Sequence, residues 1–177
     1  MRIISGTYRH RVIQPPSNFK ARPTTDLAKE SLFNILDNCI DIESVRVLDL
    51  FGGTGGISYE FASRGCTDIT CVELNYHHYN FIKRTVTDLK MEGVKVIRAD
   101  ALKFIANCNE SFDLIFADPP YDLPQLPDIP KMVIDYKLIA EDGLFIMEHS
   151  EKNKFDHMPQ FFMHKHYGAV NFSFFKL

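Results

Sequence analysis

The chain has 177 residues, of which 45% are hydrophobic and 24% are charged, and its formal net charge is −3. This size and composition predict one globular domain with a single sizeable core. No apolar run approaches the roughly 20 residues that a membrane span requires, and the N-terminus lacks the apolar core of a secretory signal. The four cysteines and seven histidines show no spacing typical of a metal site. We therefore expect a soluble, cytoplasmic protein with no membrane contact and no metal.

Positive charge is concentrated at the N-terminus. Residues 1–25 contain five basic residues and no acidic one. This segment therefore carries +5 and, because the whole chain carries −3, the remaining 152 residues carry −8. A basic segment on an acidic body is typical of a protein that meets a polyanion at one face, although a solvated tail has the same composition. The candidate residues for contact with a polyanion are Arg2, Arg9, Arg11, Lys20 and Arg22.

Two regions follow from the pattern along the chain. Residues 1–21 are predicted to form a basic arm or small hairpin, and residues 22–177 the main domain. A first helix is expected within 22–36, where Thr25 or Asp26 can cap its N-terminus.

From residue 45 onward, short apolar runs alternate with segments of helical periodicity. The predicted strands are 45–51, 68–74, 94–100, 112–117 and 143–149, and the predicted helices are 55–65, 75–90, 101–108 and a segment that starts at or after Pro130. The last residues predict two more strands around Tyr167–Gly168, as in a terminal antiparallel hairpin. Strands that alternate with helices predict a mainly parallel, doubly wound α/β sheet, with its ligand at the carboxyl ends of the strands.

The stretch VLDLFGGTGGIS (47–58) combines a strand, a glycine-rich turn and the start of a helix. Glycines at positions 52, 53 and 55 let the backbone turn sharply and approach a ligand closely. No Gly-Lys-Ser/Thr follows, so the turn is not a P-loop, and the G-x-G-x-x-G dinucleotide fingerprint fits poorly. Gly52, Gly53 and Gly55 are therefore candidate residues for binding a different cofactor.

Acidic residues lie at the ends of four predicted strands: Asp49, Glu73, Asp100 and Asp118. Glu73 can accept hydrogen bonds from two ribose hydroxyls, and Asp100 can reach an adenine amino group. Asp49 can anchor a cationic group of the ligand. So many carboxylates would repel phosphates and favour a cationic adenosine ligand. S-adenosylmethionine has that character and is the predicted cofactor.

Six stretches of the chain carry a family resemblance, in order and over residues 2 to about 150: RIISGTYRHR, RPTTDLAKESLFNIL, VLDLFGGTGGISYEFASRG, CVELN, DLIFADPPY and EHS. The chain resembles the RsmD family of class I S-adenosylmethionine-dependent methyltransferases, which act on guanine N2 of 16S rRNA. The resemblance implies a Rossmann-like, seven-stranded methyltransferase sheet. It also implies a 16S rRNA substrate within a small-subunit particle, with ribosomal protein helping to form the site. The residues added to the cofactor set with this resemblance are Thr24, Thr25, Phe51, Leu74 and Ala101.

The DPPY stretch (118–121) is the candidate catalytic motif. An exocyclic amine is a poor nucleophile because its lone pair is delocalised into the base. Asp118 can accept one N–H of such an amine, and the Pro119 carbonyl can accept the other, which aims the lone pair outward. Pro120 adds rigidity, and Tyr121 can stack on a base that has been turned out of its helix.

Other readings of the same residues stay open at this stage. A DNA adenine-N6 methyltransferase could use the same Asp-Pro-Pro-Tyr chemistry, although the chain has no room for a separate DNA-reading domain. An RNA-binding module that has lost catalysis, or an oxidoreductase with a nucleotide cofactor, would use the same fold. A monomer is expected, because a large rRNA target needs no second copy.

Overall fold

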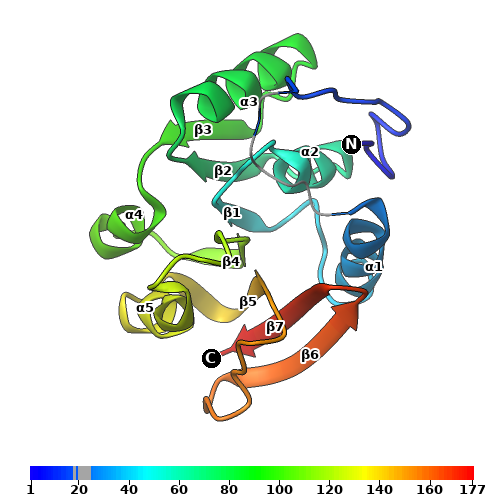
Figure 1. The fold of residues 1–177 in the computed structure, drawn as a ribbon. Coiled ribbons are helices and arrows are strands. Elements are labelled where there is room, and N and C mark those ends of the chain that lie inside the picture. Colours follow the sequence, from blue (N-terminus) through cyan, green and yellow to red (C-terminus); the bar gives the residue numbers. More distant parts are fainter. Residues whose placement is uncertain (18, 20–24) are drawn as a thin grey trace.

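A computed structural model of the protein describes residues 1–17, 19 and 25–177. They form a seven-stranded sheet with helices on both faces (Figure 1). The helices are α1 (Asp26–Leu36), α2 (Gly56–Ser63), α3 (Tyr76–Asp88), α4 (Ala101–Asn107), the 3₁₀ turn η1 (Leu126–Asp128) and α5 (Ile129–Asp135). The strands are β1 (Arg46–Leu50), β2 (Asp68–Glu73), β3 (Val94–Arg98), β4 (Phe112–Ala117), β5 (Ile139–His149), β6 (Phe161–Tyr167) and β7 (Val170–Lys176). Within these described ranges, no helix combines the length and the apolar character needed to cross a bilayer.

The strand order is β3-β2-β1-β4-β5-β7-β6, which confirms the predicted fold class. The first five strands in this order run parallel, and β7 lies antiparallel between β5 and β6. The chain moves outward from β1 to β3 and then returns to β4 on the other side of β1. In a doubly wound sheet, the ligand binds at such a reversal of direction, beside the carboxyl ends of the strands.

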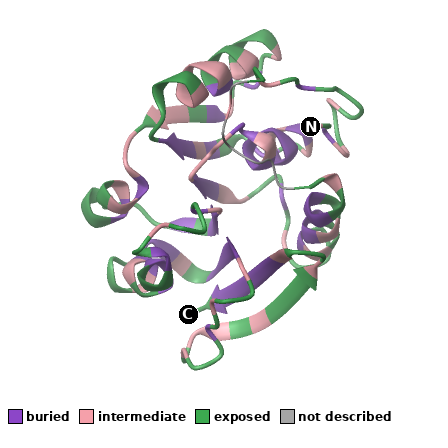
Figure 2. Cartoon of the chain, in the orientation of Figure 1, coloured by how far each residue is buried: buried purple, intermediate pink, exposed green. Residues whose placement is uncertain are grey.

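Two hydrophobic clusters pack against opposite faces of the sheet, because side chains alternate along each strand. On β4, Leu114 and Phe116 join the cluster with α1, α2 and α3, whereas Ile115 and Ala117 join the cluster with α4 and α5. Central strands such as β1 and β4 are therefore buried on both sides, whereas exposed residues lie on the outer surfaces of the helices and along the edge strand β6 (Figure 2). This explains why the central strands are continuous apolar runs.

Most element boundaries lie within two residues of the sequence prediction, and two of the differences concern how an element begins. β5 begins at Ile139 rather than 143, and its pairing with β4 shifts register between Ile139 and Leu144. Gly143 lies in this irregular stretch, where an added Cβ would be 2.9 Å from the Ala140 carbonyl oxygen. α5 begins at Ile129, one residue before Pro130, because η1 already turns the chain into helical geometry. Neither difference moves the carboxyl ends of the strands.

The N-terminal residues form a small hairpin that packs on the main domain. Arg2 and Val12 form an antiparallel bridge, and the Ile13 amide donates to the Met1 carbonyl at 3.0 Å. Ile3 and Ile13 are buried in the cluster with α1 and α2. Three predicted site residues, Lys20, Arg22 and Thr24, lie outside the described residues.

Candidate active site

Four strands bring acidic residues to one edge of the sheet. β1, β2 and β4 end at Leu50, Glu73 and Ala117, and the parallel β5 ends at His149. Asp49 pairs in register with Phe116, and Asp118 comes two residues after Phe116, directly after the end of β4. Since side chains alternate, Asp49 and Asp118 project toward the same face of the sheet, the face covered by α2.

The glycine-rich turn joins β1 to α2 in a conformation that needs glycine. Gly53 has a φ of 59° and Gly55 a φ of 84°, both in the left-handed region. An added Cβ at Gly55 would lie 2.4 Å from the Tyr59 ring. The turn also places Phe51 at a φ of 64°, which is unusual for a bulky residue and is found mostly at functional sites.

Glu73 fixes the turn relative to the neighbouring strand. One of its carboxylate oxygens accepts from the Gly53 amide at 2.7 Å, and the other accepts from the Asn75 amide at 2.7 Å. The Nδ1 atom of His78 lies 3.8 Å from the same carboxylate. Each carboxylate oxygen has two lone pairs, so Glu73 can hold the turn and still accept a hydrogen bond from a diol.

Asp49 is buried below the turn and has an altered proton affinity. Its Oδ2 accepts from the Ser58 hydroxyl at 2.5 Å, and the Cys71 thiol lies 3.8 Å from the same oxygen. Burial raises the pKa of Asp49 to about 7, although the hydrogen bond from Ser58 opposes the shift. A nearby positive charge would favour the ionised form of this carboxyl group.

Asp118 follows β4 directly, and the chain then turns at two prolines. Burial raises the pKa of Asp118 well above its usual range, and the acidic Glu148 and Asp49 raise it further. Tyr121 is 46% exposed, and its hydroxyl donates to Glu148 Oε1 at 3.1 Å. The motif therefore holds an acid and an exposed ring in fixed relation at the edge of the sheet.

Of the remaining predicted cofactor residues, Leu74 follows the carboxyl end of β2, Asp100 and Ala101 follow that of β3, and Thr25 lies at the start of α1. Asp100 caps α4 by accepting from the Lys103 amide at 3.0 Å, and Ala101 begins that helix. Leu74 follows β2 and is 58% exposed. Thr25 caps α1 by accepting from the Ala28 amide at 3.2 Å. Contact of these residues with a cofactor stays a prediction.

Sequence reasoning about the site missed three residues. Glu148 is 4% exposed and lies one residue before the end of β5, and Ser58 hydrogen-bonds Asp49 from α2. Phe19 lies against His78 with ring centroids 4.3 Å apart. The EHS stretch was a signal for Glu148, but only the strand order places it beside Asp118. His149, by contrast, is buried between the hydroxyl of Ser173 and the carbonyl of Ser150, both at 2.8 Å.

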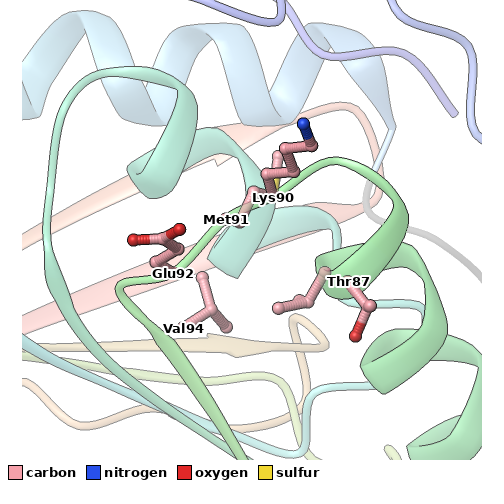
Figure 3. Close-up of a pocket in the computed structure, with 6 residues that line it drawn as sticks. Thr87, Lys90, Met91, Glu92 and Val94 are labelled. Atoms are coloured by element: carbon pink, nitrogen blue, oxygen red, sulfur yellow. The ribbon is translucent and has the colours of Figure 1, made fainter.

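Two surface hollows lie at the opposite edge of the sheet and are not part of this site. The larger, about 340 Å³, is lined by the end of α3 and the start of β3, including Lys90, Met91 and Val94 (Figure 3). The smaller, about 200 Å³, shares Lys90 and Met91 and also includes Tyr8. Among the described residues, no group of three or more His, Cys, Asp or Glu side chains could hold a metal.

The strand order, the antiparallel β7 and the acidic carboxyl edge define the Rossmann-like methyltransferase fold. Solved structures share it. One described as "Putative methyltransferase yhhF from Escherichia coli" has a TM-score of 0.86 and 26% identity, covering 99% of this chain and 96% of that one. SMU.776 complexed with SAH has a TM-score of 0.68 and 16% identity, covering 86% of this chain and 50% of that one. This second likeness concerns the fold alone.

The family is shown by the sequence itself. Residues 1–176 match the model of the family described as Conserved hypothetical protein 95, and the chain belongs to this family. A curated relative is "Ribosomal RNA small subunit methyltransferase D" of Buchnera aphidicola subsp. Baizongia pistaciae, 32% identical over 148 residues, which are 84% of this chain and 75% of that protein. The resemblance to the RsmD family is thereby confirmed.

Proposed function

We propose that the protein transfers a methyl group from S-adenosylmethionine to the exocyclic N2 of a guanine in 16S rRNA of the small ribosomal subunit. The observation that carries the proposal is the position of Asp118. It directly follows β4, and Pro119, Tyr121 and the glycine-rich turn lie at the same carboxyl edge of the sheet. The name of the curated relative supports a small-subunit rRNA substrate.

The residues at the sheet edge fit S-adenosylmethionine. Asp49 and Asp118 are acids whose pKa values are raised by burial and by acidic neighbours, so a sulfonium or ammonium group would stabilise their ionised forms. Glu73 has carboxylate lone pairs for the ribose hydroxyls, and the exposed Leu74 provides an apolar surface for the adenine. When bound, the cofactor supplies the methyl group.

The chain's own part in the reaction is to hold the target amine and to take its proton. Asp118 accepts one N–H of the amine and the Pro119 carbonyl accepts the other, so the lone pair is held in one direction. Tyr121 stacks on the base, a contact worth roughly 1–3 kcal/mol. Transfer of the methyl group gives a positively charged ammonium, which is strongly acidic and loses one proton to become the neutral N-methyl amine. The raised pKa of Asp118 makes this carboxylate a suitable acceptor for that proton.

Labelled S-adenosylmethionine tests the proposal. Small subunits that lack the modification are incubated with the protein, and the rRNA is digested and analysed for N2-methylguanine. We expect label in N2-methylguanine at one position of 16S rRNA. In Asp118→Asn the amide can still accept a hydrogen bond but cannot take the proton, and we expect the rate to fall about 100-fold or more, within the range for a lost general base.

Asp156→Asn, which changes an exposed acid, is the matched control and should keep the wild-type rate. Label in N6-methyladenine of DNA would favour the adenine-specific alternative. Binding of RNA without any transfer would favour the inactive module.

A further inference from the structure

Glu148 is a buried carboxylate that the chemistry above does not use. It lies near the end of β5, is 4% exposed, and accepts a hydrogen bond from the Tyr121 hydroxyl at 3.1 Å. A buried acid of this kind needs a function or a strong structural reason, because burying a carboxylate is costly. Its partner, Tyr121, belongs to the motif proposed to hold the base.

The strand register places Glu148 beside Asp118. Ala117 pairs with Met147 across the parallel β4–β5 ladder, so the next residues of the two strands are Asp118 and Glu148. Neighbouring strands are about 4.8 Å apart, and both side chains project toward the same face because Phe116 and Ile146 belong to the same cluster. The repulsion that Glu148 exerts on Asp118 agrees with this proximity.

Two adjacent carboxylates complement guanine and not adenine. Beside its exocyclic N2 amine, guanine presents a second donor, N1–H. Beside its N6 amine, adenine presents the lone pair of N1, which is an acceptor. A carboxylate next to Asp118 would therefore accept a hydrogen bond from guanine and would repel the N1 atom of adenine.

We propose that Glu148 selects guanine by accepting a hydrogen bond from N1–H, while Asp118 accepts one from the N2 amine of the same base. This inference rests on the proposed function. The hydrogen bond from Tyr121 fixes the orientation of the Glu148 carboxylate relative to the ring that stacks on the base. Glu148 thus turns a motif that suits several amines into one that suits guanine.

A 2-aminopurine substitution tests this selection without any protein variant. This base keeps the 2-amino group but has an unprotonated N1 in place of N1–H, and it lacks O6. Small subunits are reconstituted with 16S rRNA that carries either guanine or 2-aminopurine at the target position, and kcat/KM is measured for each. For the wild-type protein we expect kcat/KM to be about 100-fold lower with 2-aminopurine, within the range for a lost base-edge contact. Equal values for the two bases would overturn the proposal.

Glu148→Gln separates the N1 contact from the loss of O6. The glutamine amide can donate an N–H to the unprotonated N1 and can still accept from Tyr121. We expect the guanine-to-2-aminopurine ratio to fall to about tenfold or less, a change that a merely structural role would not produce. Glu141→Gln, which removes an exposed acid from the same strand, should keep the wild-type ratio.

The outcomes distinguish this inference from the proposed function. If the wild-type protein methylates guanine-containing RNA and Glu148→Gln lowers both rates equally, the proposed function stands and the role of Glu148 is wrong. If the wild-type protein methylates neither RNA nor small subunits, the proposed function itself is overturned, and the selection by Glu148 with it.

Discussion

At the scale of single residues, Asp49 shows how the fold changes the chemistry of an acid. It is 2% exposed, and its pKa is raised from 3.8 to about 7. At a pH between 3.8 and about 7, the folded protein binds a proton at Asp49 that the unfolded chain does not bind. The free energy of unfolding therefore decreases as the pH rises through this window, and above about pH 7 the full cost of the buried charge is present.

Replacement of Asp49 by asparagine tests this linkage. The amide is neutral at every pH and can still accept from the Ser58 hydroxyl. We expect the stability of Asp49→Asn relative to wild type to increase between pH 5 and pH 7, by on the order of 2 kcal/mol. Urea unfolding at several pH values measures this difference. A constant difference across the range would contradict the raised pKa, and Asp156→Asn is the control for an exposed acid.

At the scale of elements, α2 connects the N-terminal hairpin to the site. Glu60 is fully buried on this helix and accepts from the amides of Ile4 and Ser5 at 2.9 and 3.0 Å. Arg64 donates to the same carboxylate at 3.0 Å, and the Lys29 ammonium lies 3.7 Å from it. Burial lowers the pKa of Lys29, whereas the charge of Glu60 opposes that shift. One buried acid thus fixes the hairpin, α1 and α2 together.

Glu60→Gln is expected to destabilise the protein and release the hairpin. A carboxylate has two oxygens for the two backbone N–H groups, whereas the glutamine amide has only one. The substitution also leaves Lys29 and Arg64 without their buried counter-charge. Breaking a buried pair in this way costs about 3–5 kcal/mol. Urea unfolding measures the loss, and hydrogen exchange should show reduced protection of the Ile4 and Ser5 amides. Glu30→Gln on the exposed face of α1 is the control, and unchanged protection in Glu60→Gln would disprove the anchoring role.

At the scale of the whole molecule, the tip of the hairpin and the site lie at opposite ends of α2, although Met1 at the base of the hairpin contacts Thr54 in the glycine-rich turn. The amides of Thr7 and Tyr8 donate to Ser63, the last residue of α2, whereas the glycine-rich turn precedes the first. A helix of eight residues is about 12 Å long. An RNA that contacts both the hairpin tip and the DPPY motif must therefore extend along this side of the molecule (Figure 1).

The exposed Arg9 and Arg11 near the hairpin tip are predicted to bind phosphates along that path. Changing both to glutamine should weaken RNA binding and reduce the slope of log K against log salt by about 1.4–1.8, since each phosphate contact contributes about 0.7–0.9. Affinity for S-adenosylmethionine should not change, because the tip is remote from the sheet edge. Titrations at several salt concentrations measure both quantities. An unchanged slope would disprove the contact. The control is the double variant Lys131→Gln with Lys137→Gln, which makes an equal change of charge on α5 and just after it.

Local pattern was sufficient to predict most of the fold and the edge of the sheet at which the candidate site residues gather. The alternation of apolar runs with helical periodicity predicted β1 to β4 within a few residues, because burial on both faces of a parallel sheet demands such runs. The glycine-rich turn and the acids that end the strands were also visible, since each is a short contiguous feature. The DPPY stretch was recognisable for the same reason.

The sequence alone therefore determined the class of fold and that Asp49, Glu73 and Asp118 lie at the carboxyl ends of its strands, where the candidate site was predicted. Only the tertiary structure decided which groups stand beside them. Asp118 and Glu148 are 30 positions apart, and they become neighbours because β5 pairs with β4 in one particular register. The anchoring of the hairpin by Glu60 depends in the same way on how α2 packs. Contacts between distant segments arise from strand order and packing, which no local pattern of residues encodes.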